Sequence, residues 1–178
     1  MLLSRGGCRV FEGPVAVESA SDLPEVAPCL ERVRRAVASG LHAVGFLAYE
    51  AAPAFDAALR THPPGEFPLA WFGLYGGERS GEVPRSGPYE LGPWRALVGK
   101  ADYLESVRRQ REWIAAGDTY QVNYTIPLEA PFQGAPLAWF LALASAQGTD
   151  DCVFIDTGRY QVLCVSPELH FRLEDGVL

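Results

Sequence analysis

The sequence predicts a fold that combines α-helices with short β-strands. Two stretches have apolar residues at helical spacing and end at a glycine. Several other apolar runs are short, rich in β-branched and aromatic residues, and bounded by turn signals. The chain has 178 residues, of which 48% are hydrophobic and 21% charged, so it can form one sizeable core.

A strand and an amphipathic helix are the first expected elements. The strand covers residues 10–17, although a Gly-Pro pair interrupts it. Asp22 can cap the following helix, Pro24 suits its first turn, and Gly40 ends it. The apolar face of this helix, at spacings of i, i+4, i+7 and i+11, consists of Val26, Leu30, Val33 and Val37.

Two buried strands and a surface excursion are expected next. Residues 43–49 and 67–75 are short continuous apolar runs, which is typical of buried strands. Residues 76–93 are rich in glycine and proline, which regular core elements exclude. We therefore expect this part to run over the surface, with one edge strand.

A second helix, another strand and a third helix are expected in the middle of the chain. Residues 101–116 predict the helix, and Gly117 fits the left-handed position after it. The apolar face of this helix consists of Leu104, Val107 and Ile114. The β-propensity of residues 119–128 predicts a strand. Residues 137–146 are apolar nearly all round and predict a well-buried helix.

Two hairpin signals lie in the last part of the sequence. Residues 152–155 and 160–165 flank an Asp-Thr-Gly-Arg turn. Residues 169–173 lead to an Asp-Gly pair with only two residues after it. Because a return strand of two residues cannot complete a hairpin, we expect the sequence to be part of a longer protein.

Charge and cysteine usage narrow the classes of function. A net charge of −7 argues against a nucleic-acid binder and against anionic membrane surfaces. The longest apolar stretch is half of what a membrane span requires, and the amino terminus has no signal-peptide core. Four scattered cysteines indicate reduced thiols and a cytoplasmic protein. Three histidines without ligand spacing do not predict a zinc site.

Three motifs together resemble the chorismate-utilising enzymes. They are Ala-Asp-Tyr-Leu at 101–104, Ala-Gly-Asp-Thr-Tyr-Gln-Val-Asn at 116–123, and Val-Ser-Pro-Glu at 165–168 before the Asp-Gly pair. Within that family, Tyr-Gln-Val-Asn resembles the aminodeoxychorismate (para-aminobenzoate) synthase component I branch. Gly-Phe-Leu-Ala-Tyr-Glu at 45–50 resembles a segment of the amino-terminal half of that branch. The resemblance spans about residues 40–178.

The resemblance implies an α+β fold with mostly antiparallel sheets and flanking helices. In this family two antiparallel sheets pack face to face, as in anthranilate synthase component I, and the chain would be an incomplete part of that sandwich. Residues 1–98 would form an amino-terminal subdomain, and residues 99–178 would begin the chorismate-binding region. A nucleophilic lysine and the acidic ligands of Mg²⁺ are expected beyond residue 178, with no metal ligand in this chain. We therefore expect the isolated chain to be inactive.

The resemblance also implies roles for three residues. The reaction adds a nitrogen nucleophile at C2 of chorismate and removes the C4 hydroxyl, whose departure needs a proton and a Lewis acid. Glu168 takes the place of the general acid. Gln121 stands where water-adding members have a lysine base, so its neutral amide fits nitrogen addition and orients the nucleophile. Asn123 is a weaker candidate for substrate binding. Chorismate, and a glutamine amidotransferase subunit that supplies ammonia towards folate synthesis, are the implied partners.

Each role has a structural alternative, and the whole chain has two other interpretations. Glu168 could face solvent at a strand edge, Gln121 could bond to backbone, and Asn123 could make a structural hydrogen bond. On a strand, the amides would face the cavity and Tyr120 and Tyr124 the core. The chain could instead belong to an anthranilate synthase, or be a non-catalytic binding or docking module derived from this family.

Overall fold

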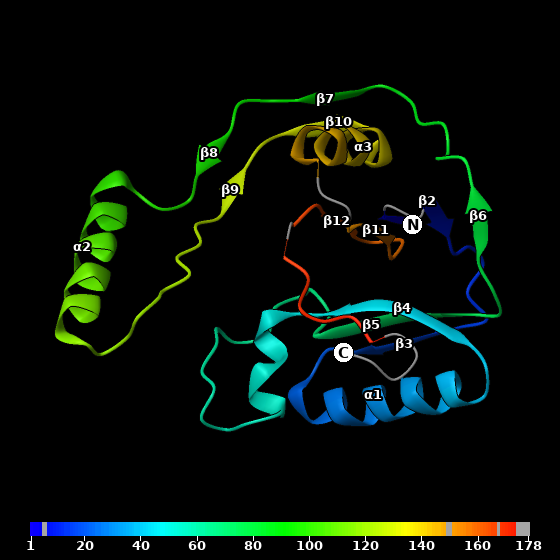
Figure 1. Ribbon diagram of the computed structural model, residues 1–178, viewed down its shortest axis with the longest axis horizontal. Coiled ribbons are helices and arrows are strands. Elements are labelled where there is room, and N and C mark those ends of the chain that lie inside the picture. The colour runs from blue at the N-terminus through cyan, green and yellow to red at the C-terminus, as the bar shows by residue number, and fades with distance from the viewer. Residues whose placement is uncertain (5–6, 149–150, 167, 174–178) are drawn as a thin grey trace. The chain divides into compact units, whose positions relative to one another are not determined.

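The computed structural model describes residues 1–178 except 5–6, 149–150, 167 and 174–178. It has an α+β fold, as predicted, with helices and antiparallel sheets (Figure 1). The chain divides into two compact units, one of Met1–Arg85 with Phe140–Leu178 and the other of Ser86–Trp139. The sequence analysis expects a division at residue 98, where the chorismate-binding region would begin. The two compact units do not test that division, so it stays a prediction.

The first unit contains a three-stranded antiparallel sheet covered by a helix. The strands are ordered β3 (Ala16–Ala20), β5 (Ala70–Tyr75) and β4 (His42–Leu47), and α1 (Leu23–Ala38) lies along one face (Figure 1). The 3₁₀ helix η1 (Tyr49–Ala54) follows β4 directly. The two strands that the sequence predicts are therefore confirmed, with β4 ending earlier than expected. β5 is buried as predicted, whereas the residues of β4 are half-buried or exposed.

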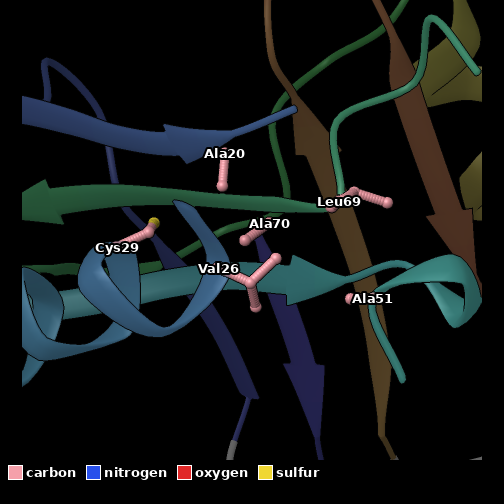
Figure 2. Close-up of a cluster of buried hydrophobic side chains, with 6 residues drawn as sticks. All are labelled: Ala20, Val26, Cys29, Ala51, Leu69 and Ala70. Atoms are coloured by element: carbon pink, nitrogen blue, oxygen red, sulfur yellow. The ribbon is translucent and has the colours of Figure 1, made fainter. Parts of the chain in front are cut away.

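The core of this unit lies between α1 and that sheet. Val26 and Cys29 of α1 are fully buried against small residues of β3 and β5. Figure 2 shows the cluster, which consists of Ala20, Val26, Cys29, Ala51, Leu69 and Ala70. Alanines on the strands let the helix approach the sheet closely, so burial of the helix's apolar face holds the layer together.

The amphipathic helix agrees with the prediction, but the strand before it does not. Asp22 occupies the cap position of α1 without a side-chain hydrogen bond, and a proline lies in the first turn. The single strand expected at residues 10–17 is wrong, because β2 (Gly7–Val10) ends at the first residue of this segment and β3 begins only at Ala16. Gly13 has a φ of +61° and precedes a proline, so the chain turns here.

A second sheet of the first unit has five antiparallel strands. Their order is β12 (Gln161–Cys164), β11 (Cys152–Asp156), β1 (Leu2–Ser4), β2 and β6 (Arg79–Gly81). The hairpin of β11 and β12 confirms the prediction, with Asp156 opposite Gln161. Its turn is fixed by the left-handed Gly158, whose N–H donates to Asp156 Oδ1 at 2.7 Å.

The second unit consists of two small sheets and a helix. β7 (Tyr89–Leu91) pairs with β10 (Phe132–Gly134), and β8 (Arg95–Ala96) pairs with β9 (Leu128–Glu129). The helix α2 (Lys100–Ala116) connects β8 to the segment that leads into β9. The expected excursion at 76–93 therefore contains two short strands, β6 and β7, where one was predicted.

Several helix and strand predictions need correction. Of the strand expected at 119–128, only Leu128, the first residue of β9, forms strand, because residues 119–127 pair with no strand in the part of the chain that the structure describes. The helix α3 (Pro136–Gln147) forms as predicted, but Phe140 is its one described residue that is buried. Residues 169–173 are not a strand, and the Asp-Gly pair after them lies outside the described residues.

No helix among the described residues has the length and apolar content needed to cross a bilayer. Cys8, Cys29, Cys152 and Cys164 are not joined by disulfide bonds. Burial raises the pKa of the Cys29 thiol, because the apolar core disfavours its charged form.

Candidate active site

The segment after α2 begins at a well-defined helix end. Gly117 adopts the left-handed conformation with a φ of +83°, as the sequence predicts. Its N–H donates to the carbonyl of Ile114 at 3.2 Å, and the N–H of Asp118 donates to that of Trp113 at 3.0 Å. This glycine cap reverses the chain and sends residues 119–127 back along α2.

Gln121 and Asn123 are brought together on this returning segment. Gln121 Nε2 donates to Asn123 Oδ1 at 3.2 Å, and the hydroxyl of Thr119 donates to the Gln121 carbonyl oxygen at 3.0 Å. Both amide side chains are exposed. The prediction that the two amides share one side of the chain is confirmed, although the segment is extended without being a paired strand.

The tyrosines of the same segment only partly follow the prediction. Tyr124 is half-buried and stacks on Tyr103 of α2, with ring centroids 5.6 Å apart and an interplanar angle of 25°. Tyr120, however, is 91% exposed, so the expectation that it faces the core is wrong. The stack of Tyr124 on Tyr103 is what holds the returning segment against the helix.

Glu168 lies after β12 in the first unit and is exposed. Its carboxylate accepts a hydrogen bond from the Ser166 hydroxyl, and its backbone N–H donates to Ser166 Oγ at 3.4 Å. The Ser166 hydroxyl, followed by the backbone of Glu168 itself, holds the pKa of this carboxyl below its usual value, while slight desolvation opposes them. Pro167, between these two residues, lies outside the described residues.

The direction of this pKa shift bears on the role expected for Glu168. A general acid needs a raised pKa, which burial away from water produces. The described residues leave Glu168 in solvent and give it a hydrogen bond that favours the ionised form. A proton-donating Glu168 therefore requires further burial of this carboxyl. Glu168 also belongs to a different compact unit from Gln121 and Asn123.

Two hydroxyl groups were missed by the sequence reasoning. Thr119 and Ser166 each lie two residues before the side chain or carbonyl group that they contact. Ser and Thr hydroxyls frequently bond to groups two residues away, so the spacing itself was the available signal. Both hydroxyls orient candidate residues and supply no chemistry of their own.

The described residues do not form a metal site. Among them, no group of three or more His, Cys, Asp or Glu side chains is placed to hold an ion. They therefore do not provide the Mg²⁺ ligands that the resemblance implies, and the expectation that these ligands lie elsewhere stays a prediction.

Two of the three arginines of α2 make contacts within the helix. Arg108 is paired with Glu105, at 2.7 Å, and with Glu112. The guanidinium of Arg109 lies over the ring of Trp113, 5.4 Å from its centroid. These contacts agree with a solvated helix surface and give no sign of a carboxylate-binding site.

Sequence comparison assigns the chain to a family. Residues 79–178 match the sequence model of the family described as chorismate binding enzyme. The chain belongs to this family. The matched region includes α2, the Gln121–Asn123 pair and Glu168, so all the candidate residues lie within it. No solved structure matches the chain.

Curated relatives fall into two groups by name. The chain is 33% identical over 100 residues to anthranilate synthase component 1 of Thermus thermophilus, covering 56% of this chain and 20% of the relative. It is 33% identical over 85 residues to the protein of that name from Pseudomonas aeruginosa, covering 48% and 17%. It is 29% identical over 98 residues to aminodeoxychorismate synthase component 1 of Salmonella typhimurium, covering 54% and 22%. The matched segment thus spans about a fifth of each relative's length.

Proposed function

We propose that the chain supplies one part of the active site of an aminodeoxychorismate synthase component I. Family membership supports binding of chorismate, and relatives with that name support the activity. The observation that carries the choice of a nitrogen nucleophile over water is the amide at residue 121, held beside Asn123. A lysine base at this position would favour addition of water, whereas a neutral amide removes no proton from the nucleophile.

The proposed reaction joins a nitrogen nucleophile to C2 of chorismate. The lysine expected beyond residue 178 is that nucleophile: its bond to C2 forms, the two ring double bonds shift, and the C4–O bond breaks. Ammonia then bonds to C4, the double bonds shift back, and the C2–N bond to the lysine breaks, which leaves the amine at C4. Glu168 gives its proton to the departing oxygen, which leaves as water, and then takes up the proton that the attacking nitrogen loses. Gln121 accepts an N–H hydrogen bond from ammonia and leaves the nitrogen lone pair free for the ring carbon that it attacks.

Anthranilate synthase component I is the second candidate function. It is favoured by the higher identity, 33%, of relatives with that name. Both activities use the same substrate class and the same nucleophile type, so Gln121 and Glu168 fit either. In both cases we propose that a glutamine amidotransferase subunit supplies the ammonia.

Product identity tests the proposal and separates the two candidates. The full-length gene product is incubated with chorismate, ammonium salt and Mg²⁺, and the products are separated by chromatography and weighed by mass spectrometry. We expect aminodeoxychorismate. Anthranilate would favour the second candidate, and absence of any aminated product would overturn both.

The 178-residue chain alone is the matched control for that assay. We propose that it does not turn over chorismate, because the described residues supply neither a metal site nor a buried proton donor. Turnover by this chain above a reaction without protein would contradict its role as one part of a larger site.

A further inference from the structure

We infer that Asn123 is a positioning residue that sets which end of the Gln121 amide faces the nucleophile. Gln121 Nε2 donates to Asn123 Oδ1 at 3.2 Å, so Gln121 Oε1 is left as an acceptor pointing away from this bond. The inference rests on the proposed function, in which Gln121 contacts the nitrogen nucleophile.

Apart from its hydrogen bond to Asn123, the Gln121 side chain has no contact among the described hydrogen bonds that would stop its amide group from rotating. It is exposed, and its backbone alone is fixed locally, by the Thr119 hydroxyl that donates to its carbonyl oxygen at 3.0 Å. A primary amide turned by 180° has the same shape but exchanges an acceptor for two donors. Among the described contacts of this side chain, the bond to Asn123 is the one that distinguishes the two orientations.

The orientation matters because ammonia has one lone pair and three N–H groups. An oxygen turned towards ammonia accepts an N–H and leaves the lone pair available for the ring carbon. An NH₂ group turned towards it would donate to that lone pair and compete with bond formation. Asn123 therefore favours the reactive arrangement without touching the reacting atoms.

Three variants of residue 123 separate this role from a structural one. Asn123→Asp can only accept, so it holds Gln121 in the same orientation at pH values where the aspartate is ionised. Asn123→Leu keeps the approximate volume and removes the acceptor. Asn123→Ala serves as a second truncation, and Val122→Ala, on the neighbouring residue outside the hydrogen-bonded cluster, is the matched control. Residues 122 and 123 are exposed, so these substitutions leave folding nearly unchanged.

Two measurements are made on these variants. In the chain itself, nitrogen-15 NMR follows the Gln121 side-chain NH₂ signals, which shift in Asn123→Leu and Asn123→Ala and are retained in Asn123→Asp. In the full-length gene product, kcat and KM for ammonia are measured with saturating chorismate. We expect kcat to fall about three- to tenfold in Asn123→Leu and Asn123→Ala, and to recover in Asn123→Asp to within about twofold. Val122→Ala is expected to behave like wild type.

The possible outcomes are distinguishable from one another. Loss of activity in Asn123→Asp equal to that in Asn123→Leu would overturn the inference, because an acceptor at residue 123 would then not be what activity requires. Unchanged kcat in all three variants would also overturn it. A Gln121→Leu variant that aminates chorismate as fast as wild type would instead refute the role of Gln121 in the proposed function.

Discussion

Tyr160 lies edge-on against Phe67, with ring centroids 5.1 Å apart and ring planes at 69°. Phe67 in turn stacks on Phe46 of β4 at 4.9 Å. Tyr160 directly precedes β12 and Phe67 comes before β5, so this row of rings joins the five-stranded sheet to the three-stranded sheet of the first unit. The ion pair of Arg159 with Glu66 lies beside it.

Replacing Tyr160 tests how much this row contributes to stability. Tyr160→Ala removes the ring contact and part of the burial, and we expect it to lower the free energy of unfolding by about 2 kcal/mol. Tyr160→Phe keeps the ring and loses only the bond of the hydroxyl to the Glu66 carbonyl oxygen at 3.3 Å, so its effect is below about 1 kcal/mol. Urea unfolding with unchanged slope measures both. Equal effects of the two variants would show that the ring contact carries no stability.

The titration of Glu168 is the second prediction. In this chain the pKa of the carboxyl lies below its usual value of 4.5, chiefly because the Ser166 hydroxyl bonds to the ionised form. That stabilisation is present above pH 4.5 and is lost as the pH falls through the lowered pKa. Carbon-13 NMR of the Glu168 carboxyl measures the midpoint.

Substitution of Ser166 identifies the cause of the shift. Ser166→Ala is expected to bring the midpoint of Glu168 back towards 4.5, whereas Ser166→Thr keeps the hydroxyl and the lowered midpoint. A midpoint that is the same in Ser166→Ala and wild type would contradict the contact. In the full-length gene product with chorismate bound, the account requires a midpoint above 4.5, because a proton donor must hold its proton.

The third prediction concerns the apolar side of α2. None of its residues is buried, and Leu104 and Ile114 are 54% and 44% exposed. An open groove of about 430 Å³ runs along this helix, lined by Leu104, Val107, Arg108, Arg111, Glu112 and Ala115. Exposed apolar area of this kind favours self-association, so we expect the chain to bind a hydrophobic dye and to form oligomers at high concentration.

A double substitution on α2 tests that expectation. Leu104→Gln with Ile114→Gln is expected to reduce dye fluorescence and the sedimentation coefficient at high concentration. Val37→Gln is the matched control, because Val37 is an exposed apolar residue of another helix, α1. We expect it to leave the dye fluorescence and the sedimentation coefficient nearly unchanged. A wild-type chain that stays monomeric and binds no dye would contradict the prediction.

The sequence predicted best where local periodicity and turn chemistry decide the structure. The helix α1, the left-handed Gly117 and the turn between β11 and β12 each depend on a few adjacent residues. By contrast, β1 was not predicted, although it lies at the centre of the five-stranded sheet. It pairs with β11, which lies about 150 positions away. A strand of three residues is too short for its sequence pattern to predict that pairing.

The segment at 119–128 is a case in which local sequence predicted a strand that the fold does not form. Its β-propensity is real, but a strand needs a neighbour, and the described residues provide one only at Leu128–Glu129. For the candidate site, the alternation of residues correctly grouped Gln121 with Asn123. The spacing of Ser166 and Glu168 allows their contact, but whether it forms depends on side-chain rotamers, which the spacing alone does not specify.

Product analysis of Gln121→Lys in the full-length gene product is the sharpest test of the proposal that the neutral amide of Gln121 favours ammonia over water. The assay is run with and without ammonia, and Glu168→Gln, which keeps the shape but lacks the proton donor, is expected to lower the rate by about two to four orders of magnitude. A protonated lysine at residue 121 competes with ammonia, and a lysine held neutral by burial removes a proton from water. We expect amination to fall and a hydroxylated product to appear in Gln121→Lys. Amination at the wild-type rate, with no hydroxylated product, would contradict this proposal and make Gln121 a structural amide.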